Sequence, residues 1–170
     1  MWEFVGPNVL TPEVPMCGAC GIKTNAYIIN PKFRLKQRSF DLSYTYDGYC
    51  IASMKLKEMF ARHKVSGVEF LSIGSDPTCF VLKPTAIVLF DAARRESIFE
   101  GMCQACGQYE GIYGATPAFL LQAPKTDIAG TDIMFGSGNA RSPIVIATDR
   151  VKWLCKQERI TAITFVVAHV

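Results

Sequence analysis

The sequence lacks three features that would place it in a well-known class of proteins. No apolar run approaches the length of a membrane span, no segment is of low complexity, and only two histidines, His63 and His169, occur among 170 residues. The longest apolar run, 160–170, is interrupted by threonine and histidine, which is typical of a buried strand. With so few histidines and no acid and base at a recognisable spacing, we expect a protein that is not an enzyme and has no membrane partner.

The sequence also has little net charge and no sign of a secretion signal. Its 18 basic and 15 acidic residues give a formal charge of +3, whereas nucleic-acid-binding domains usually carry a strongly basic patch, so we do not expect nucleic acid as a partner. Residues 1–5 show no basic stretch leading into an apolar one, which favours a cytoplasmic location. A content of 49% hydrophobic and 11% aromatic residues supplies a substantial core, and 170 residues fit a single domain, 1–170.

What the chain does have is one five-residue pattern in two copies. Cys-Gly-Ala-Cys-Gly occupies 17–21, and Cys-Gln-Ala-Cys-Gly occupies 103–107; we call each copy a knuckle. A Cys-x-x-Cys turn places two sulfurs at the spacing that one Zn²⁺ accepts, and the glycine that follows lets the backbone curl its amides toward the sulfurs. Two knuckles complete a closed tetrahedral shell. The sequence therefore predicts one structural zinc per chain, with the ligands Cys17, Cys20, Cys103 and Cys106.

The cysteines also admit other interpretations. Two disulfides would need an oxidising compartment, which neither the N-terminus nor the odd total of seven cysteines favours. A redox pair would need one knuckle at the start of a helix after a strand, and neither copy has that setting. The remaining Cys50, Cys79 and Cys155 have apolar neighbours and are predicted to be buried, inert thiols. As a nucleophile, one of them would need His63 or His169 beside it.

A larger repeat relates 51–71 to 146–166 at an offset of 95 residues. Ser53 and Thr148 are predicted helix N-caps, and apolar residues follow each at the i, i+3, i+4 spacing of a buried helix stripe. A short turn then leads into an alternating strand in each copy. The predicted stripes and strands are Leu56, Met59, Phe60 and 68–70 in the first copy, and Val151, Leu154, Cys155 and 163–165 in the second.

The two repeats together predict the fold class. The knuckles recur at an offset of 86 residues and the helices at 95, so the second half carries about nine extra residues, which we place in the glycine-rich segment 127–142. We predict an α+β fold with pseudo-duplicated halves, about 1–92 and 93–170, each running knuckle, strands, helix, strand and sharing one four-cysteine zinc site. Chance similarity of two helix–turn–strand segments is the alternative. Further strands are predicted over 25–30, 33–40, 78–82, 86–90, 109–113, 118–122 and 144–146.

These features resemble the double-CxxCG family of bacterial immunity proteins from polymorphic toxin systems. The resemblance covers nearly the whole chain. It rests on the two knuckles, on Val-Ser-Gly-Val-Glu-Phe at 65–70, on Asp-Ile-Met-Phe at 132–135 before a glycine-rich loop, and on Thr-Asp-Arg at 148–150 opening the last helix. The chain is shorter than expected of that family, and its knuckles lack the proline often found after the first cysteine. The resemblance implies a cytoplasmic protein that binds and neutralises a cognate bacterial toxin domain and is not an enzyme.

Two features of the second half are candidates for contact with the toxin. Trp153 lies off the buried helix stripe, and an exposed tryptophan is a candidate hot spot unless the long loop covers it. The glycine-rich loop would add adaptable contacts. The candidate residues are Trp153, Asp132, Gly136, Asn139 and Arg141. The alternative function, a zinc-ribbon module that binds nucleic acid or a regulator, would need basic side chains at the knuckles, and 103–113 contains none.

Four cations alternate with other residues at the predicted strand 33–40. Lys32, Arg34, Lys36 and Arg38 would share one face of an extended segment. Such a face is either a docking stripe for an acidic partner or a solvated edge protected by charge.

Overall fold

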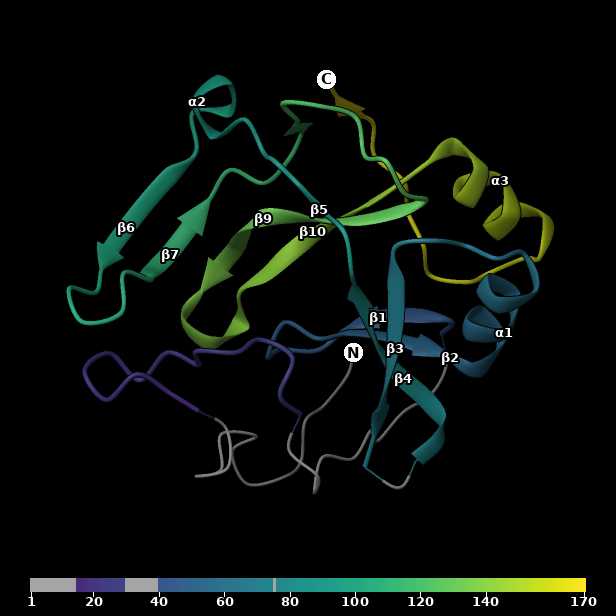
Figure 1. Ribbon diagram of the computed structural model, residues 1–170, viewed down its shortest axis with the longest axis horizontal. Coiled ribbons are helices and arrows are strands. Elements are labelled where there is room, and N and C mark those ends of the chain that lie inside the picture. Colours follow the sequence, from purple (N-terminus) through teal and green to yellow (C-terminus); the bar gives the residue numbers. More distant parts are fainter. Residues whose placement is uncertain (1–14, 30–39, 75) are drawn as a thin grey trace.

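The computed structural model describes residues 15–29, 40–74 and 76–170 (Figure 1). Three α-helices accompany a larger number of strands in these residues, so the predicted α+β class is confirmed. The predicted strand 33–40 and its four cations lie outside the described residues, apart from Phe40, which is not part of a strand. None of the described helices is long and apolar enough to cross a membrane.

The first sheet has the strand order β1–β2–β4–β3, and every neighbouring pair is antiparallel. Its strands are β1 (Leu42–Tyr44), β2 (Cys50–Ser53), β3 (Val68–Ile73) and β4 (Asp76–Pro84). Helix α1 (Met54–Arg62) follows β2 directly and leads, through a short turn, into β3. The predicted strands 68–70 and 78–82 lie within β3 and β4, so both are confirmed.

The second sheet has the order β10–β9–β7–β6, and β5 pairs in parallel with β9 beside this path. Its strands are β5 (Ile87–Val88), β6 (Ile98–Met102), β7 (Tyr109–Tyr113), β9 (Ile128–Ser137) and β10 (Ser142–Ala147). The other elements are α2 (Ala92–Arg95), the 3₁₀ turn η1 (Gly138–Ala140), α3 (Asp149–Gln157), and the parallel pair β8 (Ala118–Phe119) and β11 (Ala168–His169). The β6–β7 hairpin projects at one side of the molecule (Figure 1).

Helices α1 and α3 are formed as their sequences predict. The Ser53 side chain accepts a hydrogen bond from the Leu56 N–H at 3.2 Å and so caps α1. Thr148 occupies the N-cap position of α3, but its side chain makes no capping bond. The buried residues are Leu56, Met59 and Phe60 in α1, and Val151, Leu154 and Cys155 in α3. All six belong to one hydrophobic cluster, so the two predicted halves share a core.

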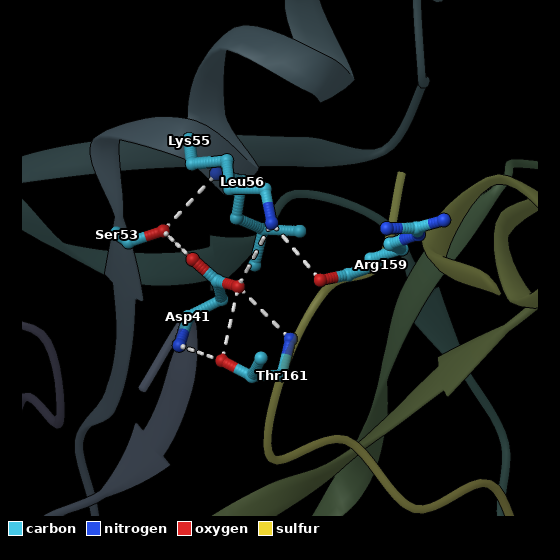
Figure 2. A network of polar contacts seen from close by, with 6 residues as sticks. All are labelled: Asp41, Ser53, Lys55, Leu56, Arg159 and Thr161. Atoms are coloured by element: carbon cyan, nitrogen blue, oxygen red, sulfur yellow. Dashed lines mark hydrogen bonds and ion pairs between the residues drawn. The ribbon is translucent and has the colours of Figure 1, made fainter. Parts of the chain in front are cut away.

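Asp41 connects the start of α1 to the segment after α3 (Figure 2). Its carboxylate accepts hydrogen bonds from Ser53 Oγ at 2.8 Å and from the backbone N–H and hydroxyl of Thr161 at 2.9 and 3.0 Å. Lys55 Nζ lies 3.5 Å from the same carboxylate and donates to the Arg159 carbonyl oxygen at 2.9 Å. Desolvation acts to raise the pKa of Asp41, but the donors on Thr161 and Ser53 and the charge of Lys55 outweigh it and hold the pKa below its usual range.

Asp127 makes the corresponding contacts on the other side of the core. Its carboxylate accepts hydrogen bonds from the N–H and hydroxyl of Ser66, just after α1, at 2.9 and 3.1 Å, and from Arg150 on α3 at 2.9 Å. Its backbone carbonyl accepts the N–H of Thr148 at 3.0 Å. Each aspartate therefore binds the start of one helix and the segment that follows the other helix.

These contacts recur at the offsets found in the sequence. Asp41 and Asp127 are 86 residues apart, as the knuckles are, while their partners are 95 apart. The partner pairs are Ser53 with Thr148, Lys55 with Arg150, and Ser66 with Thr161. Left-handed backbone also recurs at an offset of 95, with φ of 50° at Lys64 and 51° at Arg159, and of 83° at Gly67 and 60° at Ala162. The extra residues of the second half lie in the β9–β10 hairpin, which is longer than β1–β2.

The repeat is incomplete after α3, and here the prediction is wrong. Residues 163–165 have no regular secondary structure and pair with no described strand, whereas β3 in the first half pairs with β4. The side chains of Val166 and Val167 are 66% and 68% exposed. The chain pairs again only at β11. The pseudo-duplicated arrangement is therefore not confirmed for the fold as a whole.

The other strand predictions differ mainly in length. The predicted strand 109–113 matches β7, and 144–146 lies within β10. Of 86–90 and 118–122, only the two-residue strands β5 and β8 form. The prediction over 25–30 is wrong for its described part, because the Asn25 side chain accepts a hydrogen bond from the Tyr27 N–H at 2.9 Å and turns the chain.

Candidate metal centre

The two knuckles are closed by the same turn. Gly21 and Gly107 have φ of 70° and 72°, a left-handed conformation in which residues with a side chain are strained. Each glycine donates its N–H to the carbonyl oxygen of the first cysteine of its knuckle at 2.8 Å. The N–H of that cysteine in turn donates to the carbonyl oxygen five residues later, on Ile22 or Gln108, also at 2.8 Å. The second knuckle forms the tip of the β6–β7 hairpin.

The four sulfurs of the knuckles gather in one cluster. Cys17 Sγ lies 4.0 Å from Cys103 Sγ, and Cys20 Sγ lies 3.8 Å from Cys106 Sγ. All four ligand atoms lie within 4.8 Å of one another, and the cysteines are free rather than disulfide-bonded. A tetrahedral zinc with Zn–S bonds of about 2.3 Å has sulfur–sulfur edges of about 3.8 Å. The cluster can therefore hold one metal ion, and its geometry and donor set are compatible with zinc.

The protons of the cluster are divided unequally among the thiols. The backbone N–H groups of Cys20 and Ala19 lower the pKa of Cys17 to about 6, and the same turn lowers the pKa of Cys103. For Cys20 a backbone N–H also lowers the pKa, but desolvation and the neighbouring thiols outweigh it and raise the pKa to about 12. The pKa of Cys106 is raised for the same reasons. Four thiolates this close need a cation, and a bound Zn²⁺ would keep all of them deprotonated.

The loop between β9 and β10 supports both knuckles. Asn139 Oδ1 accepts the N–H of Lys23 at 2.7 Å, and Asn139 Nδ2 donates to the Gly21 carbonyl oxygen at 3.1 Å. Arg141, only 8% exposed, donates a hydrogen bond to the side-chain oxygen of Gln108 beside the second knuckle. Two residues predicted to contact a partner thus already hold the metal centre together.

Two cations are buried near the knuckles, and one of them, Arg141, faces the sulfur cluster. Burial lowers the pKa of Arg141, and the charges of Cys106 and Cys20 act in the opposite direction. Lys23 is 7% exposed, and its Nζ donates to the Asp47 carbonyl oxygen at 2.7 Å. Four thiolates and one Zn²⁺ would carry a net negative charge, and Arg141 is placed to offset it. The sequence analysis missed Lys23, whose only signal was its position two residues after a knuckle.

The other predicted contact residues have different surroundings. Asp132 Oδ1 accepts the N–H of Phe90 at 2.8 Å and so joins the segment after β5 to β9. Gly136 pairs with Ile112 across β7 and β9, with a φ of 117°. Trp153 projects from α3 with 59% of its surface exposed, so the long loop does not cover it. Of the five candidates, Trp153 is the one best placed to meet a partner.

The three remaining cysteines are buried, as predicted, with 4–7% of their surface exposed. They are Cys50, Cys79 and Cys155. Desolvation raises the pKa of Cys50 to about 12 and that of Cys155 to about 11. His63 Nε2 lies 3.3 Å from Glu158 Oε1, and the ring of His169 stacks on a phenylalanine. Cys50 and Cys155 are therefore protonated at neutral pH, and the burial of all three cysteines does not favour a role as nucleophiles.

Fold and site together define an α+β protein with a closed four-cysteine cluster suited to one metal ion. Comparison with known proteins adds no relative, since no family model, no curated protein and no solved structure matches the chain.

Proposed function

We propose that this chain is an immunity protein, which binds a cognate bacterial toxin domain in the cytoplasm and neutralises it, and whose fold is held by a structural zinc. The observation that carries the proposal is the meeting of two Cys-x-x-Cys-Gly knuckles in one cluster, with all four ligand atoms within 4.8 Å of one another. The same two knuckles carry the resemblance to double-CxxCG immunity proteins, and together they join sequence segments 86 residues apart.

The zinc in this proposal has a structural role because its ligand shell is full. Four thiolates satisfy tetrahedral Zn²⁺ and leave no position for a reacting water or substrate. Structural zinc binds small peptides with about 10 to 16 kcal/mol, which is comparable to the whole stability of a domain. The metal would thus supply rigidity, and neutralisation would be an effect of binding rather than of turnover.

We also infer that the two halves arose by duplication of one unit. The knuckles and the two aspartates, Asp41 and Asp127, share the offset of 86, and the helices with their caps share the offset of 95. Both aspartates have the same three kinds of partner: a helix start, a helix cation and the segment after the opposite helix. Duplication would explain why equivalent cysteines meet at one metal, since each unit contributes an identical half of the ligand shell.

The toxin-binding surface in this proposal is centred on α3. Trp153 is 59% exposed, and Lys152 and Lys156 are exposed on the same helix. Tryptophan is enriched among the residues that dominate binding energy. Neutralising a lethal enzyme calls for a nanomolar or tighter complex, about −12 kcal/mol, and for an interface of about 1,200 Å² or more. An aromatic anchor between two lysines suits an acidic patch on the toxin.

The test is rescue from the toxin encoded by the neighbouring open reading frame. Co-expression of this chain should restore growth of cells that make that toxin domain, and the purified proteins should form a one-to-one complex by calorimetry. A toxin domain from an unrelated system serves as the matched control and should be neither bound nor neutralised. Failure to rescue against the neighbouring toxin, or turnover of a substrate by the purified chain alone, would overturn the proposal.

A further inference from the structure

Strand β6 is an open sheet edge that carries exposed apolar side chains. It ends the order β10–β9–β7–β6, and among the described residues it pairs with β7 alone (Figure 1). All five of its residues are exposed. The side chains of Ile98, Phe99 and Met102 are 57%, 39% and 49% exposed.

Natural sheets usually protect such an edge, and the protection of β6 is limited to the charge of Glu100 and the left-handed backbone of Gly101, with a φ of 63°. Lysine or proline in the edge strand, or a helix or loop laid over it, prevents pairing with other chains. Strand β6 contains neither lysine nor proline, and none of the segments that the structure describes buries its residues. The Phe99 ring packs edge-on against Tyr109 of the same hairpin, with the ring centroids 5.1 Å apart. Free backbone groups beside exposed apolar side chains form a template for strand addition.

The hairpin that carries this edge is acidic. Segment 96–124 contains three glutamates and no lysine or arginine. Glu100 lies in the middle of β6 and is exposed. Glu110 on β7 leans toward β6, since a Cβ added to Gly101 would lie 2.9 Å from Glu110 Oε2. A strand that pairs with β6 therefore meets negative charge with no compensating cation on the hairpin.

We propose that β6 binds an extended segment of a partner protein that is both apolar and basic, and that this segment adds to the sheet as a further strand. Backbone hydrogen bonds supply affinity, and apolar side chains of the segment lie against Ile98, Phe99 and Met102. A lysine or arginine placed directly opposite Glu100 provides the charge pair. This surface is separate from Trp153 on α3 and does not depend on the proposed toxin.

Strand β6 of a second copy of this chain is expected to pair with this edge less well than a basic segment does. Two antiparallel copies of β6 centred on Glu100 would bring two carboxylates directly opposite each other. Like charges in that position are destabilising. The acidic edge therefore selects a basic partner over self-association.

The test uses two synthetic nine-residue peptides added to ¹⁵N-labelled, zinc-loaded protein. One alternates valine and threonine, with lysine at its centre and at both ends, and the other has glutamate in place of each lysine. We expect the lysine peptide to shift the amide signals of 98–102 and to slow their hydrogen exchange, and the glutamate peptide to leave them unchanged. Equal binding of the two peptides, no binding of the lysine peptide at about 1 mM, or shifts confined to residues outside 96–113 would overturn the proposal.

Reversing the charge of Glu100 tests whether the lysine peptide pairs with this residue or is attracted only by negative charge elsewhere on the protein. Glu100→Lys should weaken binding of the lysine peptide about fivefold to thirtyfold and should allow the glutamate peptide to bind. The matched control is Glu58→Lys, which makes the same charge change at an exposed position on α1 and should leave both results unaltered. An equal effect of the two substitutions, or a dimer in sedimentation experiments that Glu100→Lys disrupts, would contradict the proposal. Since neither peptide derives from a toxin, this result is independent of the immunity function.

Discussion

His63 and Glu158 occupy equivalent positions in the two helical units and contact each other, with 3.3 Å between His63 Nε2 and Glu158 Oε1. They are the C-caps of α1 and α3 and are separated by 95 residues. Cys17 and Cys103 form a second pair of equivalent residues in contact, 4.0 Å apart. In two units related by a two-fold rotation, equivalent residues touch only near the rotation axis. The proposed duplication therefore places one such axis through both the metal cluster and this ion pair.

A swap of the two residues tests that relationship. His63→Glu alone would set two carboxylates side by side, and Glu158→His alone would remove the partner of Arg62, which lies 2.7 Å from Glu158. Each single variant should lose about 1 kcal/mol or less, because these side chains are partly exposed. The double swap should recover most of that loss. Urea denaturation at about pH 6 gives the coupling free energy, and purely additive effects would contradict equivalence of the positions.

Asp41 and Asp127 should be matched in their contribution to stability. Asp41→Asn removes a charged acceptor that serves Ser53, Thr161 and Lys55, and we expect it to lower the free energy of unfolding by about 2 to 3 kcal/mol. Asp127→Asn should cost a similar amount. Urea denaturation measures both, with Glu58→Gln on the exposed side of α1 as the control. A loss confined to one aspartate would contradict the correspondence of their networks.

The stabilising effect of Asp41 is predicted to depend on pH. The folded-state pKa of Asp41 lies below the ordinary carboxyl value, so the stability that its charge contributes is present above that value and is lost as the pH falls through the folded pKa. The stability difference between the natural protein and Asp41→Asn should be constant from about pH 8 to pH 5 and shrink below about pH 4. A difference that instead shrank on raising the pH would be inconsistent with a carboxylate stabilised by its donors.

The metal centre predicts one zinc per chain in the reduced protein. Cys103→Ser removes one of the four ligands and should leave the protein insoluble or partly unfolded. Cys79→Ala, at a buried cysteine outside the cluster, should keep its zinc. Metal analysis and the absorption spectrum of the cobalt-substituted protein report stoichiometry and thiolate coordination. Reduced protein without bound metal would refute the site.

Arg141 is predicted to stabilise the zinc site without touching the metal. Arg141→Ala removes a buried cation and the hydrogen bond to Gln108, so zinc should leave about tenfold to a hundredfold faster to a competing chelator. Lys156→Ala removes a cation that is exposed on α3 and should release zinc at the natural rate. Equal rates of zinc release from the two variants would show that the position of Arg141 beside the cluster has no specific effect on the site.

Trp153 should matter for binding and little for folding. Since its side chain is 59% exposed, Trp153→Ala should change the stability by less than about 0.5 kcal/mol and leave the zinc content unaltered. Binding to the proposed toxin should weaken about thirtyfold or more. Glu58→Ala, at the equivalent position of α1, is the matched control. Natural affinity in Trp153→Ala would place the toxin elsewhere on the surface.

The features that the sequence could predict are those determined by neighbouring residues. Each knuckle is a turn set by its own five residues. Once the two knuckles are assumed to share one metal ion, the four ligands of the cluster follow. The buried stripes of α1 and α3 follow from helical spacing alone, and both formed as expected. The pattern at 163–165 is equally regular, but a strand needs a partner strand, and the sequence does not say whether one lies beside it.

What could not be predicted depends on contacts between distant segments. Asn139 binds Lys23, 116 residues away in the sequence, and so supports the metal centre. From the sequence alone, its position in a glycine-rich loop indicates a flexible surface for contact with a partner. Thr161 reaches Asp41 across 120 residues, and neither residue belongs to a recognisable motif. An open edge such as β6 also needs the order of the sheet, which the strand pattern alone does not give.

The long connection between Asp41 and Thr161 has a consequence for the growing chain on the ribosome. The first knuckle emerges with two thiols and has to wait 86 residues for the other two, about 4 to 17 s at ordinary rates of synthesis. Asp41 waits longer still, since its last donor comes 120 residues later. The contacts that join the two halves therefore cannot form until nearly the whole chain has emerged, and the early thiols depend on a reducing environment until then.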